Sequence, residues 1–347
     1  MKAHYPFPVR LLIEMFKADE LQNVESIMIE PTYGYAGRIA YKNGSLRMIR
    51  GNNLDINPHG ASEISKDKGY SKFFLQKLGY NTPKGHVFLS SDYIQLIDGN
   101  LSRYGFVDYA KTQHIFDYIQ NEVKYPCFIK PNEGSQGQDV HKCYTDDDVH
   151  QALEIYRAQC LPRFIVEETI NLPDYRVVVF NGKILACYRR HPMEVIGNGQ
   201  STIAALLRKK GEQFAISGRT TRIQLDDERI QQQLNRLNYT FETVLSKGTV
   251  FQVYEFANLS TGGTAIDYTD NIHPYWQELC LNITHNMGLR LCGVDIACSD
   301  IEDENGDYSI IEINATPGMH NFSSIGKKQT SIVRDFYRTV FNQPKLN

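Results

Sequence analysis

The sequence predicts an α+β (mixed α/β) fold, and three features of its 347 residues favour that class. Apolar runs typical of strands occur singly and in hairpins, without the steady strand–helix alternation of a doubly wound sheet. Asn181-Gly182 separates two such runs and is the strongest short hairpin signal. Near the C-terminus, two more apolar runs flank the turn-like residues 304–306. The length allows a large core and two or three subdomains.

Composition argues against several classes of protein. The formal net charge is −3 and no lysine- or arginine-rich block occurs, so no nucleic-acid partner is expected. No apolar stretch approaches the roughly 18 residues of a transmembrane helix, and the N-terminus lacks a signal-peptide core, so no membrane association is expected. The seven cysteines include no Cys-x-x-Cys pair, which predicts reduced thiols and a cytoplasmic location.

The start of the chain predicts a small irregular N-terminal region, residues 1–62. Two turn-rich patches interrupt it, at 31–37 and 51–60. A helix is expected over 63–78, because apolar residues recur there and Gly79 is a stop signal.

The rest of the chain predicts a succession of strands and helices. One helix begins at Thr145, whose hydroxyl is expected to form a capping box with Asp148. Another begins at His273-Pro274 and ends at Gly288. The other expected elements are strands at 127–130, 164–167, 175–180, 183–190 and 250–255, and helices at 201–210 and 226–237.

Asp295, Glu312 and Asn314 are expected on one face of the C-terminal hairpin. Side chains alternate along a strand, so these three point away from their apolar neighbours. Two carboxylates about 4 Å apart repel by roughly 4 kcal/mol at an effective dielectric of about 20. A buried pair therefore needs a proton or a cation, and two carboxylates with an amide suit Mg²⁺ bridging nucleotide phosphates. The alternative is a solvated hairpin face, which the apolar surroundings disfavour.

A glycine-containing loop follows the strand at 127–130. Glycines let backbone N–H groups close on phosphate oxygens, and a lysine supplies a point charge. A plain β-turn would explain the same residues equally well. The candidates are Lys130, Gly134, Ser135, Gln136 and Gly137.

Two other polar segments allow both a binding role and a plainer one. The backbone and acids of 167–176 could hold adenine and ribose, although a surface turn is the simpler explanation. The loop 258–264 could wrap a polar substrate or serve as a linker. Four arginines could stabilise developing phosphate charge, although most arginines are solvated. They are Arg189, Arg190, Arg219 and Arg222.

Taken together and in this order, these segments resemble the ATP-grasp superfamily, most of all the ATP-grasp module of cyanophycin synthetase. Relatives of the glutathione-synthetase and D-alanine–D-alanine-ligase kind are similar too. The segments that carry the resemblance are Asp67-Lys68 with Lys72, Lys130 with its glycine loop, Glu167-Glu168, Asp174-Tyr175-Arg176, 186–192, 197–203, 221–226, 257–264, Gly293-Val294-Asp295 and 312–318.

The resemblance implies two α+β lobes that clamp ATP, with an inserted lid at about 191–250. It implies ATP and two Mg²⁺ ions as cofactors, for which Mn²⁺ can substitute. The residues it implies for ATP are Lys68, Lys130, Gly134, Ser135, Gln136, Gly137, Glu167, Glu168, Ile170 and Asp174; for metal, Asp295, Glu312 and Asn314; for substrate, Asn258, Ser260, Thr261, Gly262 and Gly263; and for catalysis, Arg222 and Arg189.

Such enzymes phosphorylate a carboxylate to an acylphosphate, from which an amine displaces phosphate. The expected function is therefore an ATP-dependent carboxylate–amine ligase acting on an amino acid or peptide. The alternatives are an ATP-grasp kinase that phosphorylates a small molecule, and an ATP-binding subunit of a larger synthetase. The resemblance divides the chain into 1–62, an N-terminal part of the ATP-grasp unit at 63–172, and a C-terminal lobe at 173–347. It also implies a dimer or tetramer.

Two places depart from the family pattern. Gln138 and Asp139 stand where relatives usually have Arg-Gly, so an anion replaces a cation near the expected phosphates. Gly293 stands where ligases of the D-alanine–D-alanine kind have an arginine. If the function is conserved, another segment must therefore supply the catalytic cation.

Overall fold

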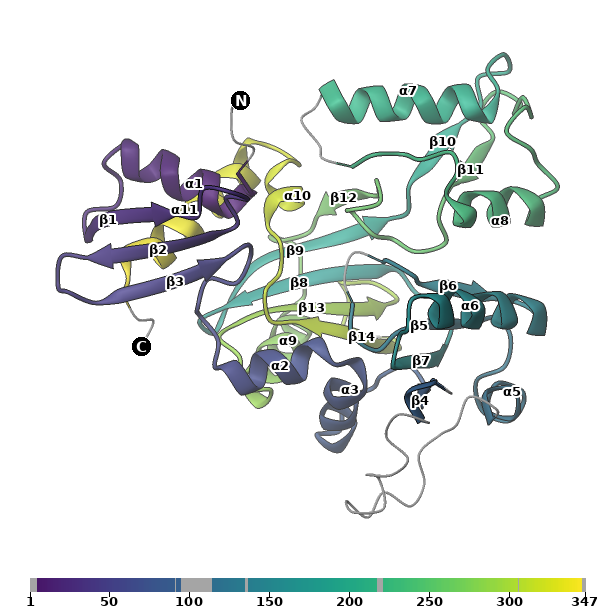
Figure 1. Cartoon of the computed structure of the whole chain (residues 1–347), viewed down its shortest axis with the longest axis horizontal. Helices are drawn as coiled ribbons and strands as arrows, with labels where there is room; N and C mark the ends of the chain where they lie inside the picture. The colour runs from purple at the N-terminus through teal and green to yellow at the C-terminus, as the bar shows by residue number, and fades with distance from the viewer. Residues whose placement is uncertain are drawn as a thin grey trace.

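The computed structural model describes residues 5–90, 92–94, 114–134, 137–216, 221–304 and 306–344. Within these ranges the chain forms four sheets, and every strand pairing in them is antiparallel (Figure 1). This arrangement confirms the predicted α+β class. No helix in the described part of the chain is long and apolar enough to cross a bilayer.

The N-terminal region is more regular than its turn-rich sequence predicted. Its elements and the C-terminal helices beside it are α1 (Phe7–Lys17), β1 (Val24–Ile29), β2 (Ala36–Tyr41), β3 (Leu46–Arg50), α10 (His320–Ser323) and α11 (Lys327–Asn342). Gly34 and Gly44, both with positive φ, occupy the turns between the strands. Apolar residues of α1, the three strands and α11 share one core, so the two ends of the chain form one unit (Figure 1).

The single helix predicted at 63–78 is two helices, α2 (His59–Lys66) and α3 (Lys68–Lys77). Asp67 separates them because its backbone is extended, with ψ at 111°. Its carboxylate accepts a hydrogen bond from the Tyr70 N–H at 2.9 Å and so caps α3. This break places Lys68 at the first residue of α3.

A four-stranded sheet carries the predicted phosphate loop. In spatial order it contains β4 (Gly85–Leu89), β7 (Arg163–Glu168), β5 (Cys127–Pro131) and β6 (His141–Cys143). The helical elements α5 (Ile115–Tyr118), η3 (Ile119–Val123) and α6 (Asp146–Ala158) pack their apolar residues against it. The capping box of Thr145 and Asp148 at the start of α6 is present as predicted.

A five-stranded sheet lies beside it (Figure 1). Its strands, in spatial order, are β12 (Thr264–Asp267), β9 (Lys183–His191), β8 (Asp174–Phe180), β13 (Leu291–Cys298) and β14 (Tyr308–Asn314). The predicted Asn181-Gly182 turn joins β8 to β9 with positive φ at both residues. Helix α9 (Pro274–Asn286) covers one face. The N-terminal unit covers only part of the other face, around Val178 and Tyr188.

The segment between β9 and β12 forms a separate small unit, which coincides with the expected lid (Figure 1). It contains β10 (Glu194–Ile196), α7 (Ile203–Ile216), α8 (Glu228–Arg236) and β11 (Val250–Gln252), around an apolar cluster of its own. Thr202, one residue later than the predicted Ser201, accepts the hydrogen bond from Ala205 N at 3.2 Å at the start of α7. The lid role itself stays a prediction.

Candidate active site

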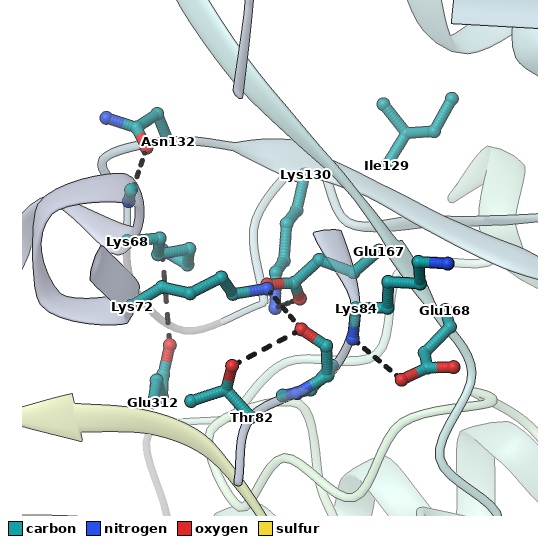
Figure 2. Close-up of polar contacts among 12 residues, drawn as sticks. Lys68, Lys72, Thr82, Lys84, Ile129, Lys130, Asn132, Glu167, Glu168 and Glu312 are labelled. Carbon is teal, nitrogen blue, oxygen red and sulfur yellow. Dashed lines mark hydrogen bonds and ion pairs between the residues drawn. The ribbon is translucent and has the colours of Figure 1, made fainter. Parts of the chain in front are cut away.

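Glu167, near the end of β7, lies between two lysines from different elements (Figure 2). Lys72 of α3 contacts one carboxylate oxygen and Lys130 of β5 contacts the other. All three side chains are buried. Burial raises the pKa of Glu167, but the charges of Lys130 and Lys72 outweigh it and hold that pKa below its usual value. Glu167 is therefore ionised and fixes the position of the Lys130 ammonium group.

Lys68 links the phosphate loop of the four-stranded sheet to Glu312 of the five-stranded sheet. Lys68 Nζ lies 4.0 Å from Glu312 Oε2 on β14 and 3.5 Å from the Gly134 carbonyl of the phosphate loop (Figure 2). The start of α3 is tied to that loop, because the Lys68 N–H donates to the Asn132 carbonyl at 3.0 Å. Burial raises the pKa of Glu312, yet Lys68, Lys130 and Arg176 together bring it down to about 2. Basic groups beside the first sheet thus face a carboxylate of the second.

The C-terminal hairpin has the geometry that the sequence predicted. Asp295 on β13 lies directly opposite Glu312, and Asn314 lies opposite Gly293 on the same face. Asn314 Nδ2 donates to Glu312 Oε1 at 3.2 Å. The sequence therefore brings its three candidate metal ligands together, although their role as ligands stays a prediction.

Two arginines contact Asp295: Arg190, one of the four arginines that the sequence offered as candidates, and Arg176, to which it assigned no role. Arg176 of β8 binds Asp295 with two nitrogens, Nε to Oδ1 and Nη2 to Oδ2, the latter at 2.6 Å. Arg190 of β9 bridges Asp295 Oδ2 at 3.1 Å and Asp174 Oδ1 at 2.6 Å. Burial and the Asp295 charge raise the pKa of Asp174 to about 6, although Arg190 acts in the opposite direction. The neighbouring strands β8 and β9 thus place two guanidinium groups beside Asp295, next to the position where Gly293 has no side chain.

The chemistry of this donor set fits Mg²⁺. The oxygens of Asp295, Glu312 and Asn314 are hard donors, which this ion prefers. In the described residues, no three His, Cys, Asp or Glu side chains are grouped to hold a metal, so the amide of Asn314 would have to complete the set. Arg176 contacts both Asp295 oxygens and Arg190 lies 3.1 Å from Oδ2, so a metal at Asp295 would share this carboxylate with the two arginines.

The structure does not bring Arg189 to this site. Strand alternation puts Arg189 on the α9-covered face, while Arg190 points to the carboxylates. Arg222, the other proposed catalytic residue, is exposed. Its neighbour Thr221 donates to the Ser260 carbonyl at 3.0 Å, so Arg222 lies beside the loop 258–263.

The described end of the phosphate loop rests on the proposed substrate segment. A Cβ on Gly137 would lie 2.7 Å from the Phe256 ring and 3.0 Å from Asn258 Nδ2. Arg229 of α8 donates to the Gly137 carbonyl at 3.0 Å, which links the inserted unit to the loop. Ser135 and Gln136 lie outside the described residues.

The remaining members of the proposed substrate segment, Ser260, Thr261, Gly262 and Gly263, lie within the same turn of backbone after Asn258. The Ser260 N–H donates to Asn258 Oδ1 at 3.1 Å, and Gly263 N–H donates to the Asn258 carbonyl at 3.1 Å. Their contacts to a substrate stay a prediction.

Asp139 adds a negative charge to the loop that is expected to bind phosphate. Its carboxylate accepts a hydrogen bond from Gln159 Nε2 at 3.2 Å, at the end of α6. The Tyr156 hydroxyl donates to its carbonyl at 2.6 Å. The negative charge is thus directed toward α6.

The proposed adenine segment continues from β7. Glu168 accepts the Lys84 N–H at 2.6 Å, which fixes the backbone that leads to Ile170 (Figure 2). Asp174, proposed to hold ribose, is engaged by Arg190. These assignments stay predictions. Sequence reasoning gave no role to Lys72 and Arg176; the alternation of Asp174 and Arg176 on one strand was the signal available for Arg176.

Comparisons with known proteins agree with this geometry. The family model of the RimK-like ATP-grasp domain matches residues 81–227 and 254–333. Cyanophycin synthetase of Trichormus variabilis is 34% identical over 277 residues, which cover 76% of this chain and 28% of that protein. The glutathione biosynthesis bifunctional protein GshAB of Mannheimia succiniciproducens is 29% identical over 290 residues, 77% of this chain and 34% of that protein.

A solved structure shows the same fold. The bifunctional glutathione synthetase from Pasteurella multocida aligns with a TM-score of 0.56 and 22% sequence identity, covering 97% of this chain and 45% of that one. Two sheets with facing lysines and carboxylates define a nucleotide-binding domain of the ATP-grasp type. The chain belongs to the RimK-like ATP-grasp family. It spans about a third or less of the length of the curated relatives described above.

Proposed function

We propose that the protein is an ATP-dependent carboxylate–amine ligase that acts on an amino acid or peptide. The approach of Lys68 to Glu312 is the observation that carries this proposal. This contact brings a lysine proposed to bind phosphate next to a carboxylate proposed to bind metal, and the transfer of a phosphoryl group from a metal-bound triphosphate requires such an arrangement. The relatives named for cyanophycin and glutathione synthesis support an amino-acid or peptide substrate.

The proposed reaction has two steps. A substrate carboxylate oxygen attacks the γ-phosphorus of ATP, and ADP leaves. An amine then attacks the acyl carbon of the acylphosphate, phosphate leaves with the bonding electron pair, and the nitrogen loses a proton. The product is an amide.

Different residues of the chain are proposed to bind phosphate, to hold the metal and to supply the catalytic cation. Lys68 and Lys130 bind phosphate oxygens, and Glu167 holds Lys130 in place. Asp295, Glu312 and Asn314 would hold Mg²⁺, whose positive charge supports phosphoryl transfer. We propose Arg190 in place of Arg189 as the catalytic cation, because Arg190 contacts Asp295 while Arg189 lies on the opposite face of the sheet.

The finer parts of the proposal are two metal ions, replaceable by Mn²⁺, and a homodimer or homotetramer. Adenine is proposed to contact the backbone from Glu167 to Ile170, with Asp174 at the ribose. The loop 258–263 is proposed to line the acceptor site, and Arg222 is proposed to stabilise the charge of the acylphosphate and of the tetrahedral intermediate. A reducing, cytoplasmic location is supported by the seven cysteines, all of which are free thiols.

Pairwise incubation of amino acids and short peptides with ATP and MgCl₂ tests the proposal. ADP release and product mass identify the acid and the amine, and hydroxylamine is expected to trap the acylphosphate as a hydroxamate. A phosphorylated product without hydroxamate would indicate a kinase. Nucleotide binding without either product would indicate an ATP-binding subunit. Glu312→Gln serves as the control that is expected to abolish turnover.

A further inference from the structure

We propose that Arg176 keeps divalent cations out of the Asp295–Glu312 site until a nucleoside triphosphate arrives, so that metal binding depends on nucleotide. This inference rests on the metal site included in the proposed function. It concerns the order of binding, which the proposed reaction does not fix.

The contact between Arg176 and Asp295 is built into the sheet. The two residues are directly opposite each other on β8 and β13, and the guanidinium uses two nitrogens to bind both carboxylate oxygens. Only 2% of the Asp295 side chain and 15% of the Arg176 side chain are exposed. Gly293 leaves the space that the Arg176 side chain crosses, 3.1 Å from a Cβ placed there. A bidentate arginine–carboxylate pair with little solvent is among the strongest polar contacts in proteins.

Every carboxylate of the cluster already has a basic partner. Arg190 reaches both Asp174 and Asp295, and Lys68 lies near Glu312. The burial of Arg176 lowers its pKa, but Asp295 raises it well above the usual value, so the guanidinium stays charged.

A bare divalent cation therefore gains little at this site. It would lose hydration water, which Mg²⁺ gives up reluctantly, and would meet a fixed guanidinium beside each oxygen of Asp295. A bound triphosphate makes metal binding more favourable. Its negative charges attract Lys68, Lys130 and Arg190, and its oxygens supply further metal ligands. Metal and nucleotide are then expected to bind together.

The test is a titration with Mn²⁺, followed by the electron paramagnetic resonance signal of the free ion, on the full chain. After correction for the Mn²⁺ that the analogue binds in a protein-free titration, wild-type protein is expected to bind Mn²⁺ roughly tenfold or more tightly with a non-hydrolysable ATP analogue than without it. Arg176→Met is expected to gain nucleotide-free binding by a similar factor. Arg290→Met removes an exposed arginine just before β13 of the same sheet and is expected to leave Mn²⁺ binding unchanged.

Equal Mn²⁺ affinity of the wild-type protein with and without the analogue would overturn the inference. So would a natively folded Arg176→Met whose nucleotide-free affinity matches wild type. If that variant does not fold, Arg176→Gln carries the same comparison, and the wild-type titration still tests whether Mn²⁺ binding depends on nucleotide. Loss of the ligase proposal looks different: no acid–amine pair releases ADP, while nucleotide-dependent Mn²⁺ binding persists.

Discussion

The backbone of Gly293 runs directly under the side chain of Arg176. A Cβ at position 293 would lie 3.1 Å from Arg176 Cδ and 3.0 Å from Pro317 Cβ. The missing side chain is what lets an arginine of β8 cross to Asp295 on β13. Strand β13 thus has a glycine where the Arg176 side chain crosses it, and β8 supplies the positive charge beside Asp295.

Substituting Gly293→Val is expected to displace Arg176. Overfilling a packed site of this kind costs about 1–3 kcal/mol, which urea unfolding measures. Gly211→Ala is the matched control, because nothing lies within 4 Å of a Cβ there and the residue is inside α7. That variant is expected to gain about 0.5–1 kcal/mol. A Gly293→Val protein as stable as wild type would contradict the packing described.

Substituting Glu167→Gln removes the charge shared by Lys72 and Lys130. Leaving two buried ammonium groups without a counter-ion is expected to cost about 3–5 kcal/mol at pH 7, measured by denaturant unfolding. Glu122→Gln is the control, since its pair with Lys84 is half exposed. The control is expected to show little change. Similar losses in both variants would refute the special role of the buried pair.

The same carboxylate predicts a pH dependence of stability. The pKa of Glu167 is lowered from 4.5 in the folded protein, so the unfolded chain takes up this proton first as the pH falls. The stabilisation is therefore complete above about pH 4.5 and is lost as the pH falls through the folded value. The stability difference between wild type and Glu167→Gln should shrink below pH 4.5. A stability difference between the two proteins that stays constant down to the acid transition would argue against stabilisation by the ionised Glu167 carboxylate.

Substituting Lys68→Met is expected to weaken ATP binding by roughly tenfold to a hundredfold, the usual effect of losing a charged hydrogen bond. Among the described residues Lys68 pairs with Glu312 across a long 4.0 Å distance, so stability should change little. Lys66→Met, two residues earlier in an exposed pair with Glu63, is the control. Isothermal titration with an ATP analogue provides the readout. Equal affinity of the two variants would remove Lys68 from the phosphate site.

The adjacent arginines of β9 offer a paired comparison. Arg190→Met is expected to lower ADP release by about a hundredfold, because it removes a cation beside the phosphoryl path. Arg189→Met, on the opposite face, is expected to lose far less. Thermal melts of both variants separate this effect from unfolding. The reverse ranking would restore Arg189 as the catalytic cation.

The sequence predicted most of the structural features that depend on the local spacing of side chains. The capping box at Thr145, the turn at Asn181-Gly182 and the hairpin of Asp295 and Glu312 follow from side-chain spacing alone. The broken helix at Asp67 was missed, because an aspartate inside an apolar period also fits a continuous helix.

The choice between Arg189 and Arg190 shows a limit of such reasoning. A regular ladder from the two-residue turn would pair Asp174 with Arg189. The strands instead shift register between Val178 and Val179, so Asp174 pairs with Arg190. One extra residue in a strand turns every later side chain to the other face. Nothing in the local sequence marks that shift. The partners of Arg176 likewise depend on how three strands meet, which spacing within one strand does not reveal.

The inserted unit leaves and rejoins the body of the protein at one point, since Glu194 of β10 lies opposite Gln252 of β11. Its cross-connection to the phosphate loop depends on Arg229. Recombination between related genes could therefore exchange the inserted unit without changing the geometry of the two junctions. A chimera joined at these two residues should melt as cooperatively as its parent, and its choice of acceptor would report what the inserted unit contributes.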